Sequence, residues 1–168
     1  KAPVVVEEVQ GKKAFRFDGN QFFCSSFTLP ATLRDNAPYT LEAWVLNPDL
    51  AENECVADFT SSHDELEKIM LVNGTEPRCG MLNHYGWYED VGYKDAKNLA
   101  GKWQHIYVVF DGRIEKVYIN DQLISSKDIQ LLIKPIQFVT LGQNAEGNWP
   151  FSGYVHTLKI WDEALPLN

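Results

Sequence analysis

GKWQHIYVVFDGRIEKVYINDQL is the sequence of residues 101–123. Two runs rich in β-branched and aromatic residues flank Asp111-Gly112, which is the strongest short-range signal for a β-hairpin. Side chains alternate along a strand, so one predicted face is apolar and consists of Ile106, Val108, Phe110, Val117 and Ile119. The opposite face is largely aromatic and consists of Trp103, His105, Tyr107, Val109 and Tyr118. We therefore expect a second sheet over the apolar face, whereas the aromatic outer face stays available for another role.

Strand-like segments lie on both sides of this hairpin. The segment 39–45 is predicted to be a central strand in which Trp44 faces away from Leu41. The segment 122–129 is predicted to be an edge strand. The other predicted strands are 3–9, 13–17, 55–59, 69–72, 136–141 and 151–161. Frequent turn signals without helical periodicity favour an all-β fold of two packed antiparallel sheets, a jelly roll or sandwich.

The composition favours one globular domain that spans residues 1–168. Hydrophobic residues make up 45% of the chain, which is enough for a well-buried core. The formal net charge of -8 argues against nucleic acid as a partner, because that binding depends on Lys and Arg neutralising phosphates. No apolar run approaches the roughly 20 residues of a membrane-spanning helix. The chain begins at Lys1 without a signal segment, which we interpret as a mature or excised piece with an extracellular or cell-surface location.

The cysteines are Cys24, Cys55 and Cys79, and their odd number leaves at least one thiol unpaired within the chain. Their spacing is not that of a zinc site. Two interpretations stand for Cys55 and Cys79: a disulfide between neighbouring strands, or separate thiols buried as small apolar groups.

Several short motifs, taken in their order and spacing, carry a family resemblance. They are FDG at 17–19, YTLEAWV at 39–45, GKWQHI at 101–106, VYIN at 117–120, LG at 141–142, FSG at 151–153 and IWDEAL at 160–165. Over nearly its whole length the chain resembles the laminin-G-like, concanavalin A-like lectin/glucanase superfamily. The resemblance implies a two-sheet antiparallel jelly-roll sandwich. One departure is His156-Thr157 in the last strand, where members of this family often carry an Asp-Glu pair.

The resemblance also implies a structural calcium ion, because related domains frequently hold one near their termini. Asp18, Asn20 and Asp162 are the candidate ligands, since they supply the hard oxygen atoms that calcium prefers. The alternative is that residues 18–20 form an ordinary turn, and the missing acidic pair at His156-Thr157 favours this alternative. No other cofactor is expected.

Catalysis finds little support in the sequence. Glycoside hydrolysis needs two carboxylates flanking one bond, whereas Asp64, Glu65 and Glu67 lie in a predicted solvated loop. The four histidines are scattered, and no nucleophile elbow or phosphate-binding glycine loop occurs. We therefore expect that the chain is not an enzyme.

The segment 83–93, NHYGWYEDVGY, combines aromatic rings with amide, imidazole and carboxylate groups. An aromatic ring stacks on the apolar face of a pyranose while polar neighbours bond its hydroxyls. We expect ligand contact at Trp87, with His84 and Asp90 as polar partners. A second platform is expected at Trp149, and the predicted outer face extends the site through Tyr107 and Tyr118. The alternative is that these aromatics pack beneath their loops.

These observations together favour a non-catalytic carbohydrate-binding or adhesive module within a larger extracellular protein, with adjoining domains and a glycan as partners. The alternative is a protein-interaction or spacer domain in which the same aromatics are buried. A divergent glycoside hydrolase is a third and weaker hypothesis.

Overall fold

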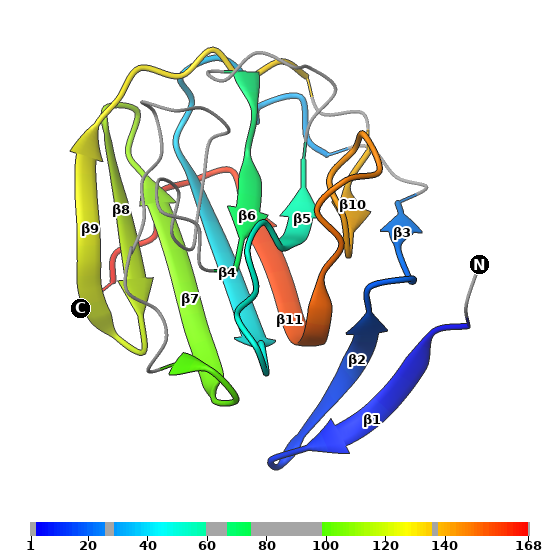
Figure 1. Cartoon of the computed structure of the whole chain (residues 1–168). Coiled ribbons are helices and arrows are strands. Elements are labelled where there is room, and N and C mark those ends of the chain that lie inside the picture. The colour runs from blue at the N-terminus through cyan, green and yellow to red at the C-terminus, as the bar shows by residue number, and fades with distance from the viewer. Residues whose placement is uncertain (1–2, 26–28, 60–66, 75–98, 136–137, 168) are drawn as a thin grey trace.

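A computed structural model gives the structure of the protein and describes residues 3–25, 29–59, 67–74, 99–135 and 138–167. Its strands form two antiparallel sheets (Figure 1). The large sheet has seven strands in the order β1-β2-β11-β4-β7-β8-β9, and the small sheet has four in the order β3-β10-β5-β6. The predicted all-β, two-sheet jelly-roll sandwich is therefore confirmed. The strands are β1 Val5–Val9, β2 Lys12–Asp18, β3 Phe23–Cys24, β4 Tyr39–Leu46, β5 Cys55–Asp58, β6 Met70–Val72, β7 Trp103–Phe110, β8 Ile114–Ile119, β9 Gln122–Asp128, β10 Thr140–Leu141 and β11 Ser152–Trp161.

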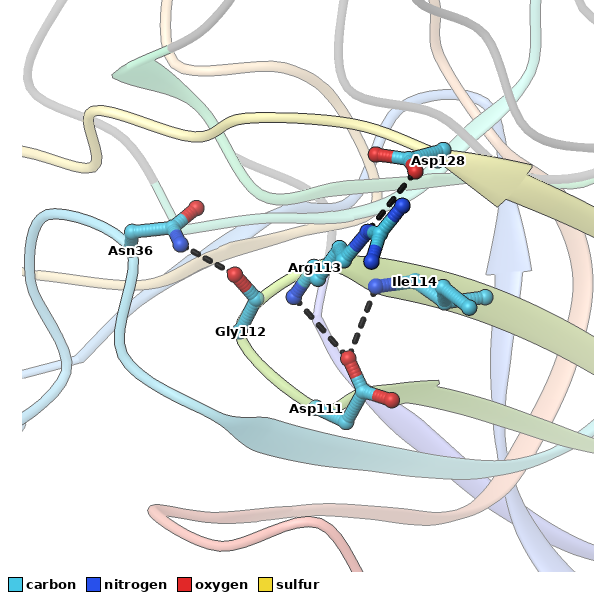
Figure 2. A network of polar contacts seen from close by, with 6 residues as sticks. All are labelled: Asn36, Asp111, Gly112, Arg113, Ile114 and Asp128. Carbon is cyan, nitrogen blue, oxygen red and sulfur yellow. Dashed lines mark hydrogen bonds and ion pairs between the residues drawn. The ribbon is translucent and has the colours of Figure 1, made fainter.

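The predicted hairpin is the pair β7 and β8, with Tyr107 opposite Tyr118. Asp111 closes its turn, because its Oδ1 accepts hydrogen bonds from the backbone N–H of Ile114 at 2.7 Å and of Arg113 at 2.9 Å (Figure 2). These bonds, the one from Ile114 first, lower the pKa of Asp111. Gly112 adopts a φ of 98°, which favours glycine, and its carbonyl accepts a hydrogen bond from the Asn36 amide. Local turn chemistry thus fixes the hairpin and ties it to the segment before β4.

The core lies between the two sheets, where the predicted apolar face of the hairpin is confirmed. Ile106, Val108, Phe110 and Val117 have no exposed surface, and Ile119 is 3% exposed. The neighbouring strand β4 adds Leu41, Ala43 and Val45, as expected, and the small sheet adds Val56, Ala57 and Leu71. Full burial of one such side chain contributes about 1.5–3 kcal/mol, so this layer is the main source of stability.

One polar pair lies within this core. Tyr39 is 2% exposed and donates a hydrogen bond from its phenol to the carboxylate of Glu115, which has no exposed surface. Burial, followed by the negative charge of Glu115, raises the pKa of Tyr39 well above its usual value. The phenol therefore stays protonated as a donor to the buried carboxylate.

The remaining strand predictions agree with the structure in most places. The strand β9 is an edge of the large sheet, as predicted. Of the segment predicted as a strand at 136–141, the structure describes residues 138–141, and Thr140–Leu141 form β10. The short strand β3 was not predicted from the sequence. Cys55 is a buried free thiol and Cys24 an exposed one, whereas Cys79 lies outside the described residues. Within the part of the chain that the structure describes, no helix is long and apolar enough to cross a membrane.

Candidate functional site

On the outer face of the large sheet, which points away from the small sheet, side chains form rows across the strands. The register places Lys159, Glu42, Tyr107, Tyr118 and Leu123 opposite one another on β11, β4, β7, β8 and β9. The adjacent row places Thr157, Trp44 and His105 together. Neighbouring strands lie about 4.8 Å apart, so residues far apart in sequence come into contact along each row.

Trp44 has contacts on both faces of its indole ring. The imidazole of His105 stacks on it with ring centroids 4.2 Å apart and an interplanar angle of 9°. The ammonium nitrogen of Lys12 lies 4.0 Å from the indole centroid. Lys12 approaches from β2 and His105 from β7, which lie on opposite sides of β4 in the large sheet, so the two groups occupy opposite faces of the ring. Trp44 therefore acts as a spacer that orients His105 rather than as a free stacking platform.

Glu42 connects the side chains of the two rows. It is 8% exposed, and its Oε1 lies 2.8 Å from His105 Nε2 while its Oε2 lies 3.8 Å from Lys159 Nζ. The pKa of Tyr107 is raised by partial burial first, and then by the charge and the hydrogen bond of Glu42. The phenol of Tyr107 is therefore protonated at neutral pH, and its hydrogen bond to Glu42 helps fix its orientation beside His105.

A hollow of about 220 Å³ opens next to this network. Its lining residues are His105, Tyr107, Tyr118, Asp121, Pro166 and Leu167. The C-terminal residues after β11 form one wall, because they return over the outer face of the large sheet (Figure 1). Thr40 on β4 holds this segment: its hydroxyl donates to the carbonyl of Glu163 at 2.8 Å and accepts the N–H of Leu165 at 2.9 Å.

The turn between β8 and β9 forms another part of the rim, through Asp121. Asn120 and Asp121 have φ angles of 50° and 66°, as the two-residue turns of twisted hairpins require. Asn120 Oδ1 accepts the backbone N–H of His105 at 2.9 Å, and the Asn120 N–H donates to the His105 carbonyl at 2.8 Å. These two hydrogen bonds hold the turn against β7 and thereby place Asp121 at the hollow.

A larger recess of about 810 Å³ lies between the two sheets near β2, β3, β10 and β11. Its inward-facing side chains are apolar, and Phe15, Phe23, Val155, Leu158 and Ile160 are among them. A ligand with many hydroxyl groups needs several polar partners. The smaller hollow offers an imidazole, two phenols and a carboxylate together, so we take the smaller hollow as the candidate site.

The structure brings two of the ligand contacts predicted from the sequence together in the hollow and places a third elsewhere. Tyr107 and Tyr118 are brought together as cross-strand neighbours in the hollow. Trp149 is half-buried and packs against Cys55, Met70 and Val72 of the small sheet. Because Met70 and Val72 alternate with the inward-facing Leu71, Trp149 lies on the opposite side of the sandwich from the tyrosines. Trp149 is therefore separate from the hollow, and its role as a second platform stays a prediction.

The other predicted contacts, His84, Trp87 and Asp90, lie outside the described residues.

The predicted calcium ligands do not come together. Asp18 pairs with Ser152 at the start of β11, whereas Asp162 follows the last residue of that strand, roughly 30 Å away at about 3.3 Å per residue. Asp18 Oδ1 accepts hydrogen bonds from the backbone and side-chain N–H groups of Asn20, so these residues form a turn. Asp162 Oδ2 accepts the hydroxyl of Thr32 at 2.7 Å. The three residues therefore cannot bind one ion, which corrects that expectation.

Within the described ranges, no three or more His, Cys, Asp or Glu side chains lie together in a group that could hold a metal ion.

Sequence reasoning missed four residues of the site: Glu42, Asp121, Pro166 and Leu167. Parity with Trp44 places Glu42 on the outer face, but the pairing of β4 with β7 joins segments far apart in the chain. The Asn120-Asp121 dipeptide is a turn signal that could have located Asp121. No local pattern indicates that Pro166 and Leu167 return over the sheet.

Comparison with known proteins agrees with this architecture. Residues 23–167 match the family model described as the concanavalin A-like lectin/glucanases superfamily. Domain 4 of an extracellular arabinanase from Geobacillus stearothermophilus, in complex with arabinotriose, is 21% identical over 99% of this chain and 78% of that chain, with a TM-score of 0.71. A heptameric SAP-like pentraxin from Limulus polyphemus is 18% identical over 90% of this chain and 76% of that chain, with a TM-score of 0.65.

Domains LG4-5 of the mouse laminin alpha1 chain are 12% identical, over 92% of this chain and 42% of that chain, with a TM-score of 0.64. At these identities each similarity shows the fold alone. No curated protein matches the chain by sequence.

Proposed function

Because the chain belongs to the concanavalin A-like lectin/glucanase superfamily, we propose that it is a non-catalytic carbohydrate-binding module whose site is the hollow on the outer face of the large sheet. In this proposal, residues 1–168 form one laminin-G-like domain of a larger extracellular or cell-surface protein. The adjoining domains of that protein carry any chemistry.

The observation that carries the proposal is the meeting of Tyr107, Tyr118, His105 and Asp121 in one hollow. A pyranose presents an apolar face and a rim of hydroxyls, so its recognition needs ring surface and hydrogen-bonding groups together. Glu42 and Trp44 hold His105 and Tyr107 in place before any ligand arrives, which lowers the entropic cost of binding. The arabinotriose complex of the arabinanase domain is consistent with sugar binding on this fold.

We retain Trp87, with His84 and Asp90, as a proposed additional contact. This contact has to be tested separately from the hollow, because these residues lie outside the part of the chain that the structure describes.

The environment of Glu42 supports a non-catalytic role. Hydrolysis of a glycosidic bond needs one carboxyl group as acid and a second as nucleophile or base. Glu42 instead contacts His105, Tyr107 and Lys159, so its oxygens position neighbouring side chains. Of the carboxylates in the described ranges, Asp121 alone then remains at the hollow, and one carboxylate does not supply both roles.

A glycan array probed with the purified chain tests the proposal. We expect binding to a restricted set of oligosaccharides, with no release of products during prolonged incubation. Absence of binding to every glycan would contradict the carbohydrate-binding proposal, and turnover of a bound glycan would contradict the non-catalytic one.

One observation favours the second candidate, a protein-interaction or spacer domain. Val4, Val6 and Phe15 are 39%, 48% and 45% exposed, and Val6 pairs with Phe15 on the face of the β1–β2 hairpin that points toward the small sheet. Exposed apolar surface of this kind is typical of protein contacts. Under this alternative the chain binds a protein partner rather than a glycan, and Phe15→Ser abolishes binding of that partner.

A further inference from the structure

The described charged groups at and next to the Asp121 side of the hollow are carboxylates. Asp121 is exposed at the rim and makes no ion pair with the described residues, while Glu42 lies behind His105 and Tyr107. Burial raises the pKa of Tyr107 first, and the charges of Glu42 and, last, of Asp121 raise it further. Among the residues that the structure describes, none that lines the hollow is Lys or Arg. An incoming ligand therefore meets an uncompensated negative group at Asp121.

The described lysines of the outer face interact with groups that do not line the hollow. Lys12 lies over the Trp44 indole, on the side away from His105. Lys159 pairs with Glu42 at 3.8 Å and lies 6.0 Å from the Trp161 ring centroid. The charge of Lys116 acts on Asp111, at the far end of the hairpin, where it adds a small part to the lowering of the pKa that the N–H groups of Ile114 and Arg113 cause. Within the described part of the chain, these cations leave the Asp121 side of the hollow uncovered.

The aromatic rings of the hollow, like the Asp121 carboxylate, favour a cationic ligand. Tyr107 and Tyr118 are half-buried neighbours, and no described ring stacks on Tyr118. The face of a tyrosine ring attracts a cation within about 6 Å of its centroid. The formal net charge of -8 adds a long-range field that attracts cations and repels anionic ligands.

We propose that the hollow selects a protonated amine, and that its preferred ligands are oligosaccharides of amino sugars whose amino groups are free. In the bound state the ammonium group lies between the Asp121 carboxylate and the Tyr118 ring, and the sugar hydroxyls bond His105. Acetylation of the amine removes the charge, and glycans with carboxylate or sulfate groups are disfavoured. This inference rests on the proposed function and specifies its ligand class.

Calorimetric titration with glucosamine oligosaccharides and N-acetylglucosamine oligosaccharides of equal length tests the inference. At a pH where the amine is protonated, we expect about tenfold tighter binding of the free-amine ligand, because a charge-assisted contact and a cation–π contact are lost on acetylation. Added salt should reduce this preference, since the Asp121 contact is exposed.

Asp121→Asn provides the decisive variant, because Asn tolerates the positive φ of this position. We expect Asp121→Asn to weaken the free-amine ligand about fivefold more than the acetylated ligand, because only the free amine loses a contact between opposite charges while the Asn amide still bonds hydroxyls. Asp35→Asn is the matched control: it removes the same charge at a φ of 53°, on the segment that bridges Ile133 rather than at the hollow. This control should change neither affinity.

The outcomes separate the inference from the function on which it rests. Equal affinity for the two ligands, or an unchanged affinity of Asp121→Asn for the free-amine ligand, overturns the inference and leaves carbohydrate binding standing. Binding of only neutral or acidic glycans on the array likewise overturns the inference and leaves carbohydrate binding standing. Absence of binding to all glycans overturns the proposed function together with the inference.

Discussion

The indole of Trp44 lies parallel to the imidazole of His105, with 4.2 Å between ring centroids. The two residues are directly opposite each other on β4 and β7. Because Lys12 covers the other face of the indole, the stack is closed on both sides. His105 is thereby held with its Nε2 at Glu42, and its outer edge faces the hollow. Trp44 is thus a positioning residue for a site that it does not line.

Replacing Trp44 tests this positioning role. An aromatic pair contributes about 0.5–1.5 kcal/mol, so Trp44→Ala should weaken glycan affinity about threefold to tenfold by releasing His105. Trp44→Phe keeps a ring over the imidazole and should retain most of the affinity. The two variants are compared by calorimetric titration. Equal affinity of wild type and Trp44→Ala would mean that His105 is not oriented by this stack.

Phe110 tests the register of the hairpin. It has no exposed surface, so Phe110→Ala should lower the free energy of unfolding by about 3–5 kcal/mol in chemical denaturation. Val109→Ala on the same strand is the control, because Val109 lies on the outer face and should cost about 1 kcal/mol or less. A loss below about 1 kcal/mol for Phe110→Ala would place this residue outside the core.

The buried pair of Tyr39 and Glu115 makes stability depend on alkaline pH. The folded-state pKa of Tyr39 is raised, so its contribution is fully present below the unfolded value of about 10 and is lost as pH rises from there toward the folded value. The free energy of unfolding should therefore decline above about pH 10. Tyr39→Phe should flatten this decline.

At neutral pH the same substitution should cost about 1–3 kcal/mol, because it leaves the Glu115 oxygen without its phenol donor. Tyr154→Phe is the control, since its hydroxyl is only partly buried and its oxygen lies 3.5 Å from Glu7. An alkaline profile that is identical in wild type and Tyr39→Phe would show that Tyr39 does not set the pH dependence.

Metal removal should have little effect, because Asp162 is far from Asp18 and Asn20 along β11. Chelation should leave both the melting temperature and the glycan affinity unchanged. A ligand that binds only the folded state raises the melting temperature with concentration. A strong rise of melting temperature and affinity with added calcium would therefore reveal a site that these three residues do not form.

The sequence predicts this fold well where the information is local. Alternation fixes which side chains of residues 103–119 are buried, and the Asp111-Gly112 turn places Tyr107 opposite Tyr118. The same parity puts Trp44 and Leu41 on opposite faces, as the structure confirms. These features follow from strand geometry and turn chemistry, which act over a few residues.

The candidate site depends on information that is not local. β11 lies between β2 and β4, so the contacts of Lys12 with Trp44 and of Glu42 with Lys159 join distant segments. The wall formed by Leu167 depends on the docking of the C-terminal segment at Thr40. For Trp149 the composition of its loop gives no sign of the sheet against which it packs. Tertiary packing, rather than propensity, decides each of these positions.

The most direct measurement of the central claim is the affinity of Tyr118→Ala for the best glycan of the wild type, with Tyr154→Ala on β11 as the matched outer-face tyrosine outside the hollow. We expect Tyr118→Ala to lose about 1–3 kcal/mol of binding free energy with little change in unfolding midpoint, because truncation removes contact area from the complex. Tyr154→Ala should bind like the wild type. Unchanged binding by Tyr118→Ala, or an equal loss in both variants, would contradict the assignment of the hollow as the carbohydrate site.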